Sequence, residues 1–456
     1  MNYTSQDYYA IEEEKRSYFL LRIIEDYQNS HEYRTAIRAQ QYYRRRNPNV
    51  LARMSYLERT RRRKINVKFH RLCSGWFRKL IVHANGYLLG NGVSLSDENK
   101  TKLGNRFDKI LLQMGNNALV DGVCWGYWDV EQGLVPFRSA EVGKGFIMLQ
   151  DERTGTPTVG IRYWQLTLNK PLYIAVYERD GVTEYIARDE KINLYTEKIP
   201  YMTRIGTSPA AGSQIIGIEN HDVLPIFPLY ANELKQSEIV GLDGYIDAYD
   251  FIASDMVDSI TMVDGLYSIV KNYGGDDLEQ LVQEIHEKKI IYADGDNAGG
   301  SFDAIETPYM SKKEALSFLE QRITIDFMVP SSMSGRAATA TEINLNREPL
   351  DFKADLFELQ VIDFVENVLH LIGIDEEPKF KRRTTTNDTE ITNAVNVMRP
   401  DLSLKTALKL YPLLPDDLIE ENITELALEE LGRDADLNEP VEIPPGEAAT
   451  EEEGAR

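Results

Sequence analysis

The stretch PSSMSG, residues 330 to 335, brings three serine hydroxyl groups together and is the first place to look for a nucleophile. A nucleophile elbow needs the pattern G-x-S-x-G on a sharp turn that directly follows a strand. The stretch lacks this pattern, and the segments on both sides of it have the apolar spacing of helices. We therefore predict no catalytic role for Ser331, Ser332 or Ser334, and the chain is not expected to be an enzyme.

Residues that could bind a metal ion or a phosphate group are isolated along the chain. The six histidines occur singly, without an H-x-x-x-H pair. DGDNAG, which begins at Asp294, is similar to the start of a calcium-binding loop, but Glu306 is one position out of register for the twelfth ligand. GNGVSL lacks the Gly-Lys-Ser or Gly-Lys-Thr ending of a phosphate-binding loop. The sequence thus predicts no metal ion and no cofactor.

Helical spacing surrounds the serine-rich stretch. After Asn232, apolar residues recur every three or four positions as far as Val263, which predicts a long helix. Seven acidic residues and no Lys or Arg lie between Glu238 and Asp264, so the polar face of this helix should be strongly negative. The predicted acidic face consists of Asp243, Asp247, Asp250, Asp255 and Asp258.

Two further helices are predicted on either side of PSSMSG. Ser311 and Glu314 have the spacing of a capping box, which predicts that the earlier helix starts there. Pro349 should either start or kink the later helix. The apolar stripes of these helices are Leu316, Leu319, Ile323 and Phe327, and then Phe357, Val361, Phe364, Val368 and Leu371. Between the first and second helices, GDDLEQLVQEIHEKK predicts a short helix and KIIYADGD a strand.

The first half of the chain changes from helical to extended patterns. Residues 5 to 80 are predicted to be largely helical, with a break at Asn47-Pro48, and the glycines of HANGYLLGNGVSL end this part. From Asp121, alternating apolar positions separated by Gln-Gly, Thr-Gly and Asp-Gly predict a meander of antiparallel strands. The meander should continue through KINLYTEKI and end at VLPIFPLYAN.

Composition limits the class of protein. The 456 residues are 42% hydrophobic, enough for two or three globular domains. Cys73 and Cys124 are far apart, which predicts a reducing compartment and two buried thiols. No signal peptide is recognised, and no apolar run approaches the roughly 18 residues of a membrane span. We expect a soluble protein made in the cytoplasm, without a membrane partner.

The net charge of −22 is unevenly distributed. Residues 31 to 80 contain 15 Lys and Arg but only two acidic residues, a net charge of +13. This basic segment could contact phosphate or another anionic surface, or it could be a helix whose basic face meets an acidic protein surface. Residues 375 to 456 carry −12, and the tail from Asn438 has the composition of a disordered segment.

Five stretches occur in an order that points to one family. They are YLLGNGVSL, DGVCWGYWDVEQG, VLPIFPLYAN with the following GLDGYIDAYDFIASDMVDSI, FMVPSSMSG, and LSLKTALKLYPLLPDDLIEE. This order resembles the portal proteins of long-tailed double-stranded DNA bacteriophages, the siphophage type, over about residues 5 to 435. The arm before Arg53 and the tail after Arg433 have no recognisable match.

The resemblance implies an α+β subunit with a helical wing and small β-sheet, a two-helix stem, a small α/β clip and a helical crown, assembled into a ring. By position, the wing would comprise residues 1–235 and 341–385, the stem helices 236–264 and 311–329, the clip 265–310, the tunnel loop 330–340, the crown 386–435 and the disordered tail 436–456. The ring of 12 copies would sit at one capsid vertex of the virion, after assembly in the host cytoplasm. Double-stranded DNA would pass through its channel during packaging and ejection, without sequence specificity.

The same resemblance assigns the site residues. Pro330, Ser331, Ser332, Met333, Ser334, Gly335 and Arg336 would form a loop that projects into the channel. The clip residues Asp294, Gly295, Asp296 and Asn297 would dock the large terminase subunit and a head-completion adaptor. The ring would also contact the major capsid and scaffolding proteins. An acidic stem face would repel DNA and keep its path free. A cytoplasmic nucleic-acid-binding or scaffolding protein with a basic arm is the alternative, and a hydrolase built on PSSMSG is a further one.

Overall fold

The computed structural model describes residues 3–53, 70–167, 169–188, 191–208, 212–262, 267–271, 299–303, 309–330 and 340–382, with residues 395, 397, 408, 423 and 424. The chain divides into two units, Met1–Arg383 and Thr384–Arg456. The elements described below belong to the first unit. They combine helices with antiparallel sheets, so the predicted α+β class is confirmed.

Several helices come before the first of the larger sheets in the described part of the chain. They are α1 (Ser5–Ala10), α2 (Glu13–Gln28), α3 (His31–Tyr43), α5 (Trp76–Leu89), α6 (Asp97–Leu103) and α7 (Phe107–Asp121). Thr4 begins α1 with a capping box, and the Ser30 hydroxyl accepts a hydrogen bond from the Tyr33 amide at the start of α3. The predicted break at Asn47 is present, with helical structure resuming at Pro48.

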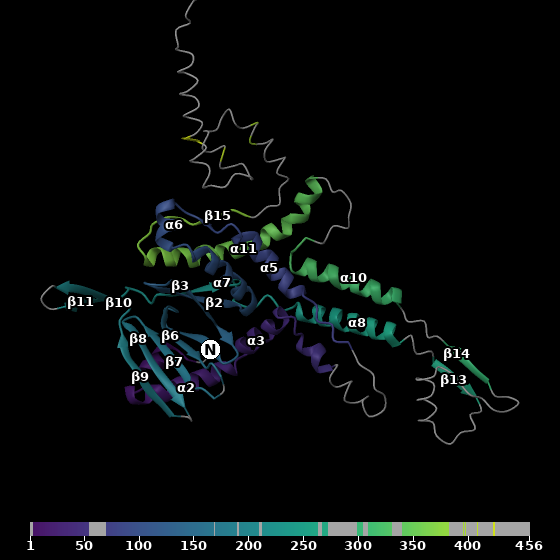
Figure 1. Cartoon of the computed structure of the whole chain (residues 1–456), viewed down its shortest axis with the longest axis horizontal. Coiled ribbons are helices and arrows are strands. Elements are labelled where there is room, and N and C mark those ends of the chain that lie inside the picture. Colours follow the sequence, from purple (N-terminus) through teal and green to yellow (C-terminus); the bar gives the residue numbers. More distant parts are fainter. Residues whose placement is uncertain are drawn as a thin grey trace, which may run out of the picture. The chain divides into compact units, whose positions relative to one another are not determined.

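The predicted antiparallel meander is present as a six-stranded sheet whose strand order follows the chain. Its strands are β4 (Ala140–Glu141), β5 (Lys144–Gln150), β6 (Pro157–Trp164), β7 (Leu172–Glu178), β8 (Gly181–Arg188) and β9 (Lys191–Ile199). The Thr-Gly and Asp-Gly turns connect β5 to β6 and β7 to β8, as expected. Figure 1 shows α2 lying along this sheet, and Leu20 and Ile23 of α2 join its buried apolar cluster.

The prediction that VLPIFPLYAN closes the meander is wrong. β12 (Ile226–Tyr230) instead pairs with β2 (Val123–Asp129), which also pairs with β3 (Gly133–Arg138) in a separate three-stranded sheet. Alternating apolar residues fix which face of a strand is buried, but they do not choose its partner. A hairpin, β10 (Met202–Ser208) and β11 (Gly212–Glu219), lies between β9 and β12 in the chain.

Three long helices follow the sheets. They are α8 (Asp243–Met262), α10 (Tyr309–Asp326) and α11 (Ala340–Leu371). Figure 1 shows α8 and α10 side by side, and the hairpin of β13 (Tyr267–Lys271) and β14 (Gly299–Asp303) lies between them in the chain. The predicted start of α10 at Ser311 is wrong, because the helix already begins at Tyr309.

The longest helix, α11, carries the predicted apolar stripe. Phe357, Val361, Phe364 and Val368 are buried in the main core against α5 and β12, and Leu371 is partly buried. Pro349 lies inside the helix, where it cannot donate a backbone hydrogen bond. Pro349 therefore does not start the helix, and Figure 1 shows that α11 bends along its length. β1 (Val93–Ser94) pairs with β15 (Lys379–Phe380) soon after α11 ends.

In the parts of the chain that the structure describes, no helix is long and apolar enough to cross a membrane.

Candidate functional site

The acidic helix α8 is covered by a segment from the N-terminal part of the chain. We call residues 38–53 and 70–74 the cover segment. Side chains and backbone amides of this segment reach four of the five carboxylates that the sequence assigns to the acidic face. The acidic face of α8 is therefore largely an internal surface of this chain.

Asp250 is the most deeply buried of these carboxylates, with 1% of its surface exposed. It accepts a hydrogen bond from the Asn47 amide (2.9 Å) and another from the Ser74 backbone N–H (2.8 Å). One turn later, the Leu72 backbone N–H donates to the Ser254 hydroxyl at 3.0 Å. Burial raises the pKa of the Asp250 carboxyl, and the hydrogen bonds from Asn47 and Ser74 oppose that rise. The two bonds fix both parts of the cover segment, residues 38–53 and 70–74, to α8.

Asp258 lies two turns further along α8 and is 5% exposed. It accepts a hydrogen bond from the backbone N–H of His70 at 2.9 Å, and its carboxylate is 2.8 Å from the ring Nδ1 of the same residue. The carboxylate therefore fixes both the main chain and the ring of His70. Burial of Asp250 and Asp258 corrects the expectation of an exposed acidic face, because neither carboxylate is accessible to solvent in this chain.

The first turns of α8 use their carboxylates in the same way. Asp247 accepts hydrogen bonds from the Tyr42 hydroxyl (2.7 Å) and the Asn49 amide (2.6 Å). Asp243 forms an ion pair with Arg38 at 3.1 Å. The basic segment had two interpretations, contact with phosphate and contact with an acidic protein surface. Arg38 agrees with the second, because it pairs with Asp243 of α8. The stretch ERTRRRK within that segment lies outside the described residues.

Asp255 faces away from the cover segment and links the two paired helices. Its side chain is 67% exposed and forms an ion pair of 2.7 Å with Lys312 of α10. Lys312 also donates to the Ser259 hydroxyl at 2.8 Å. Of the five predicted acidic residues, Asp255 is the one whose side chain is mostly exposed to solvent.

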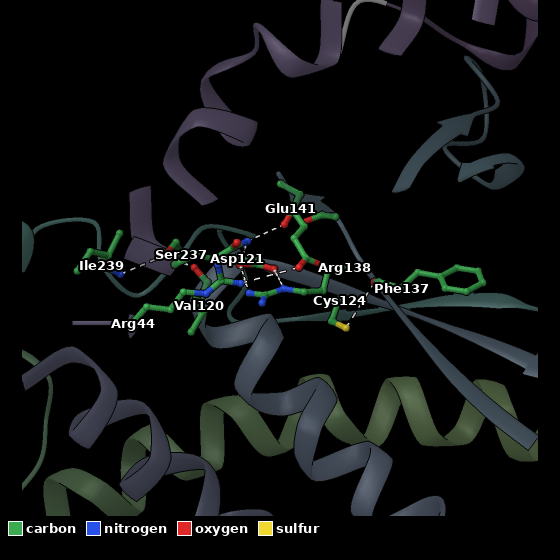
Figure 2. Close-up of polar contacts among 12 residues, drawn as sticks. Arg44, Val120, Asp121, Cys124, Phe137, Arg138, Glu141, Ser237 and Ile239 are labelled. Atoms are coloured by element: carbon green, nitrogen blue, oxygen red, sulfur yellow. Dashed lines mark hydrogen bonds and ion pairs between the residues drawn. The ribbon is translucent and has the colours of Figure 1, made fainter. Parts of the chain in front are cut away.

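A second polar cluster holds the start of the cover segment, at Gln40, and the chain that leads into α8. Asp121, at the end of α7, receives two hydrogen bonds of 2.7 Å from the Arg138 guanidinium and one of 3.0 Å from Gln40. Figure 2 shows this carboxylate beside Ser237, whose hydroxyl donates to the Val120 carbonyl at 2.5 Å. Burial raises the pKa of Asp121, and the adjacent Arg138 opposes that rise.

The cluster has a structural role. Its carboxylate joins Gln40 of α3 to Arg138 of β3, and Ser237 fixes the chain just before α8. The polar atoms are buried, so each requires a partner within the protein. The cluster therefore positions α8 relative to both α3 and the three-stranded sheet.

The two cysteines differ in their environments. Cys124 is fully buried, which raises the pKa of its thiol to about 12, so the prediction of a buried thiol is confirmed for this residue. Cys73 is only partly buried. The structure describes Pro330 but not residues 331–336, and the clip residues 294–297 also lie outside the described residues. Within the described part of the segment predicted as the clip, β13 pairs with β14.

Comparisons with known proteins identify relatives over most of this chain. The family described as phage portal protein, SPP1 Gp6-like, matches residues 24–433. The portal protein of Bacillus phage SPP1 is 24% identical over 421 residues, covering 81% of this chain and 80% of that protein. The portal protein of Clostridium phage phiCD119 is 22% identical over 256 residues, covering 52% of this chain and 56% of that protein.

Proposed function

Because the chain belongs to the SPP1 Gp6-like phage portal protein family, it is a non-catalytic virion component, the head-to-tail connector for DNA packaging, and we propose how its parts perform that role. The family implies an oligomeric ring through which DNA passes. In our proposal the ring has 12 copies and occupies one capsid vertex, after assembly in the host cytoplasm. DNA enters the capsid through it during packaging and leaves during ejection.

We assign α8 and α10 to the stem, and the hairpin β13–β14 with residues 272–298 to the clip. The wing would combine the N-terminal helices, the sheets and α11, and residues 386–435 would form the crown. The side-by-side packing of α8 and α10, with the clip inserted between them in sequence, supports this assignment. The described helices would give the stem a fixed length, whichever DNA sequence passes through the ring.

The contact between the cover segment and α8 is the observation that carries the proposal for the stem. A DNA channel must let phosphates pass without holding them, and exposed Lys or Arg side chains would bind phosphate. Arg38 is instead neutralised by Asp243, and the buried Asp250 and Asp258 fix the cover segment on α8. We propose that only accessible carboxylates contribute to repelling DNA. Of the five, Asp255 is the most exposed, and its ion pair with Lys312 offsets part of its charge.

The tunnel loop, residues 330–340, would contact the DNA directly. It joins α10 to α11 and carries small residues with a single base, Arg336. The clip residues Asp294 to Asn297 would dock the large terminase subunit and later the head-completion adaptor. The wing would meet the major capsid and scaffolding proteins.

Ring formation is tested by purifying the full chain and measuring its mass by size-exclusion chromatography with light scattering. We expect one species with the mass of 12 copies of the 52.1 kDa chain. A stable monomer at micromolar concentration would contradict the proposed ring.

The clip is tested by deleting residues 294–300. Rings should still form, because the deletion lies outside the described contacts between α8 and α10. DNA packaging, or attachment of the head-completion adaptor that forms the neck between head and tail, should fail. Normal packaging and normal neck attachment together would remove the docking role from this segment.

A further inference from the structure

The helix α11 presents an apolar stripe to solvent on the side away from the core. Phe352, Leu356 and Leu359 are 56%, 62% and 59% exposed. Their spacing of four and three places them on one helix face. Phe357 and Val361, on the opposite face, are buried in the main core. Three large apolar side chains along one exposed face indicate a surface that is covered by another protein surface.

A second stripe lies on α10. Phe318 and Ile325 are 53% and 60% exposed, and Arg322 lies between them with its guanidinium 5.5 Å from the Phe318 ring. The opposite face of α10 contributes Leu319 and Ile323 to the buried residues. Like the stripe on α11, this stripe spans eight residues, and its seven steps give a rise of about 10 Å in an α-helix.

The two stripes differ in charge. Arg322 lies at the centre of the α10 stripe, whereas the exposed acids Glu348 and Asp363 lie one turn beyond the two ends of the α11 stripe. Among the described residues, none of these three side chains forms an ion pair with another part of the same chain. Opposite charges at the edge of an apolar contact favour one partner and one register over others.

A closed ring of identical subunits requires this kind of asymmetry. Its contacts are heterologous, so each subunit must present two different surfaces that fit each other. We propose that the α10 stripe of one subunit packs against the α11 stripe of the next subunit in the ring. The inference rests on the proposed ring and names the residues that close it.

Cross-linking between the centres of the stripes tests the contact. For this test the chain is prepared with three substitutions. Arg322→Cys and Leu356→Cys introduce the two reactive thiols, and Cys73→Ser removes the partly buried natural thiol, while the buried Cys124 is left in place. A short bis-maleimide added to assembled rings should give a ladder of covalent multimers on a denaturing gel. Chains with only one of the two new cysteines should stay monomeric on that gel. The proposed contact joins an α10 stripe to an α11 stripe, so such chains have only one new cysteine at each contact.

Three results would overturn the proposal. Intact rings that give no ladder would place the contact elsewhere. A cross-link formed within one chain would also count against it. So would dimers from either single-cysteine chain, because such dimers would show that two copies of the same stripe contact each other. Absence of rings in the unmodified chain is a separate outcome that would contradict the proposed function itself.

Substitutions test the same contact without a cross-linker. Leu356→Glu should raise at least tenfold the protein concentration needed for half of the chains to assemble. Leu166→Glu is the matched control, since Leu166 is 72% exposed on a loop of the six-stranded sheet, and it should leave that concentration unchanged.

Charge reversal gives a rescue. Arg322→Glu should weaken assembly, and adding Glu348→Arg with Asp363→Arg should restore it at least in part. Equal assembly of wild type, Leu356→Glu and Arg322→Glu would refute the contact. Circular dichroism of each variant distinguishes lost assembly from lost folding.

Discussion

The side-chain amide of Asn47 donates a hydrogen bond of 2.9 Å to the buried carboxylate of Asp250, across 203 residues of sequence. Asn47 also caps the chain that follows it, since its side-chain oxygen accepts from the backbone N–H groups of Asn49 and Val50. One asparagine therefore starts the helical turn at Pro48 and fixes it to α8. This relationship ties the N-terminal helices to the helix that we assign to the stem.

Removing the Asp250 carboxylate should destabilise the protein. Asp250→Ala leaves the Asn47 amide and the Ser74 backbone N–H without their acceptor, and an unsatisfied buried donor costs about 1–3 kcal/mol. Urea unfolding, followed by circular dichroism, measures the change in the free energy of unfolding. Asp255→Ala is the control, because the Asp255 side chain is 67% exposed and ion pairs of solvent-exposed carboxylates contribute at most about 1 kcal/mol. Equal effects of the two substitutions would contradict the role of Asp250.

The acidic helix illustrates what the sequence could and could not predict. The period of its apolar residues correctly placed a helix there, because a core-facing stripe must recur with the helical turn. Whether its carboxylates are exposed or buried was not predictable. A carboxylate occupies the same position in the helical pattern whether its hydrogen bonds come from water or from a residue far away in sequence. Asp250 and Asp258 are satisfied by Asn47, Ser74 and His70, all far away in sequence.

The sheets show the same division between local and distant information. The turns at Thr154-Gly155 and Asp180-Gly181 were predictable, because glycine accepts the backbone angles of tight turns. The pairing of β12 with β2 was not, since it joins strands separated by the whole meander. Of the candidate site, the sequence indicated α8 and its charge but not the cover segment that binds its carboxylates.

A methyl group added at Gly126 should destabilise the core between β2 and α11. Its Cβ would lie 2.6 Å from the Phe364 ring and 3.0 Å from the Leu134 side chain. Phe364 is fully buried, so neither neighbour can move freely, and overpacking of this kind costs about 1–3 kcal/mol. We expect Gly126→Ala to lower the urea midpoint accordingly.

Gly86→Ala is the matched control for this prediction. Gly86 lies inside α5, and an added Cβ would have no atom within 4 Å apart from the backbone of its own helix and its chain neighbours. Alanine restricts the unfolded chain more than glycine, so this substitution should stabilise the protein by about 0.4–1 kcal/mol. If both alanine variants shifted stability in the same direction, the packing of Gly126 against Phe364 would be wrong.

Glu376 should make the stability of this region depend on acid pH. Its carboxylate accepts hydrogen bonds from the Ser96 backbone N–H and hydroxyl (both 2.8 Å) and from the Asn99 amide (2.6 Å). The bonds from Asn99 and Ser96 hold the pKa of Glu376 below its ordinary value of 4.5. A carboxyl whose pKa is lower in the folded state stabilises the protein above its ordinary pKa, and this contribution is lost as the pH falls through the lower value.

Glu376→Gln should therefore be less stable than wild type at neutral pH, and the difference should shrink at an acid pH below the lowered pKa of Glu376, where the wild-type carboxyl also becomes protonated. Urea midpoints at both pH values measure the effect. Glu377→Gln, at an exposed neighbour without a side-chain hydrogen bond among the described residues, should show no such change between the two conditions. A constant difference for Glu376→Gln would mean that its ionisation is not coupled to folding.

Arg336 is the single base in the loop that we place in the DNA channel. In a ring of 12 copies it would form a basic ring facing the DNA. Each contact with phosphate should be weak and exchangeable, because the Debye length at cellular salt is only about 8 Å. The loop would then slow or check DNA movement without driving it. Arg336→Glu should leave folding, ring assembly and capsid incorporation unchanged while altering the amount or retention of packaged DNA.

Packaged DNA per capsid and its retention after heating measure this effect, with Arg153→Glu as the matched control. Arg153 lies in the exposed turn between β5 and β6, and its substitution introduces the same change in charge. It should not alter DNA content, since that turn belongs to the proposed wing and not to the channel. If Arg336→Glu prevented assembly, Arg336 would instead lie at a contact between subunits, because loss of a base from a loop facing DNA gives no reason for subunits to separate. If both variants packaged and retained DNA like wild type, the loop would have no part in checking DNA movement.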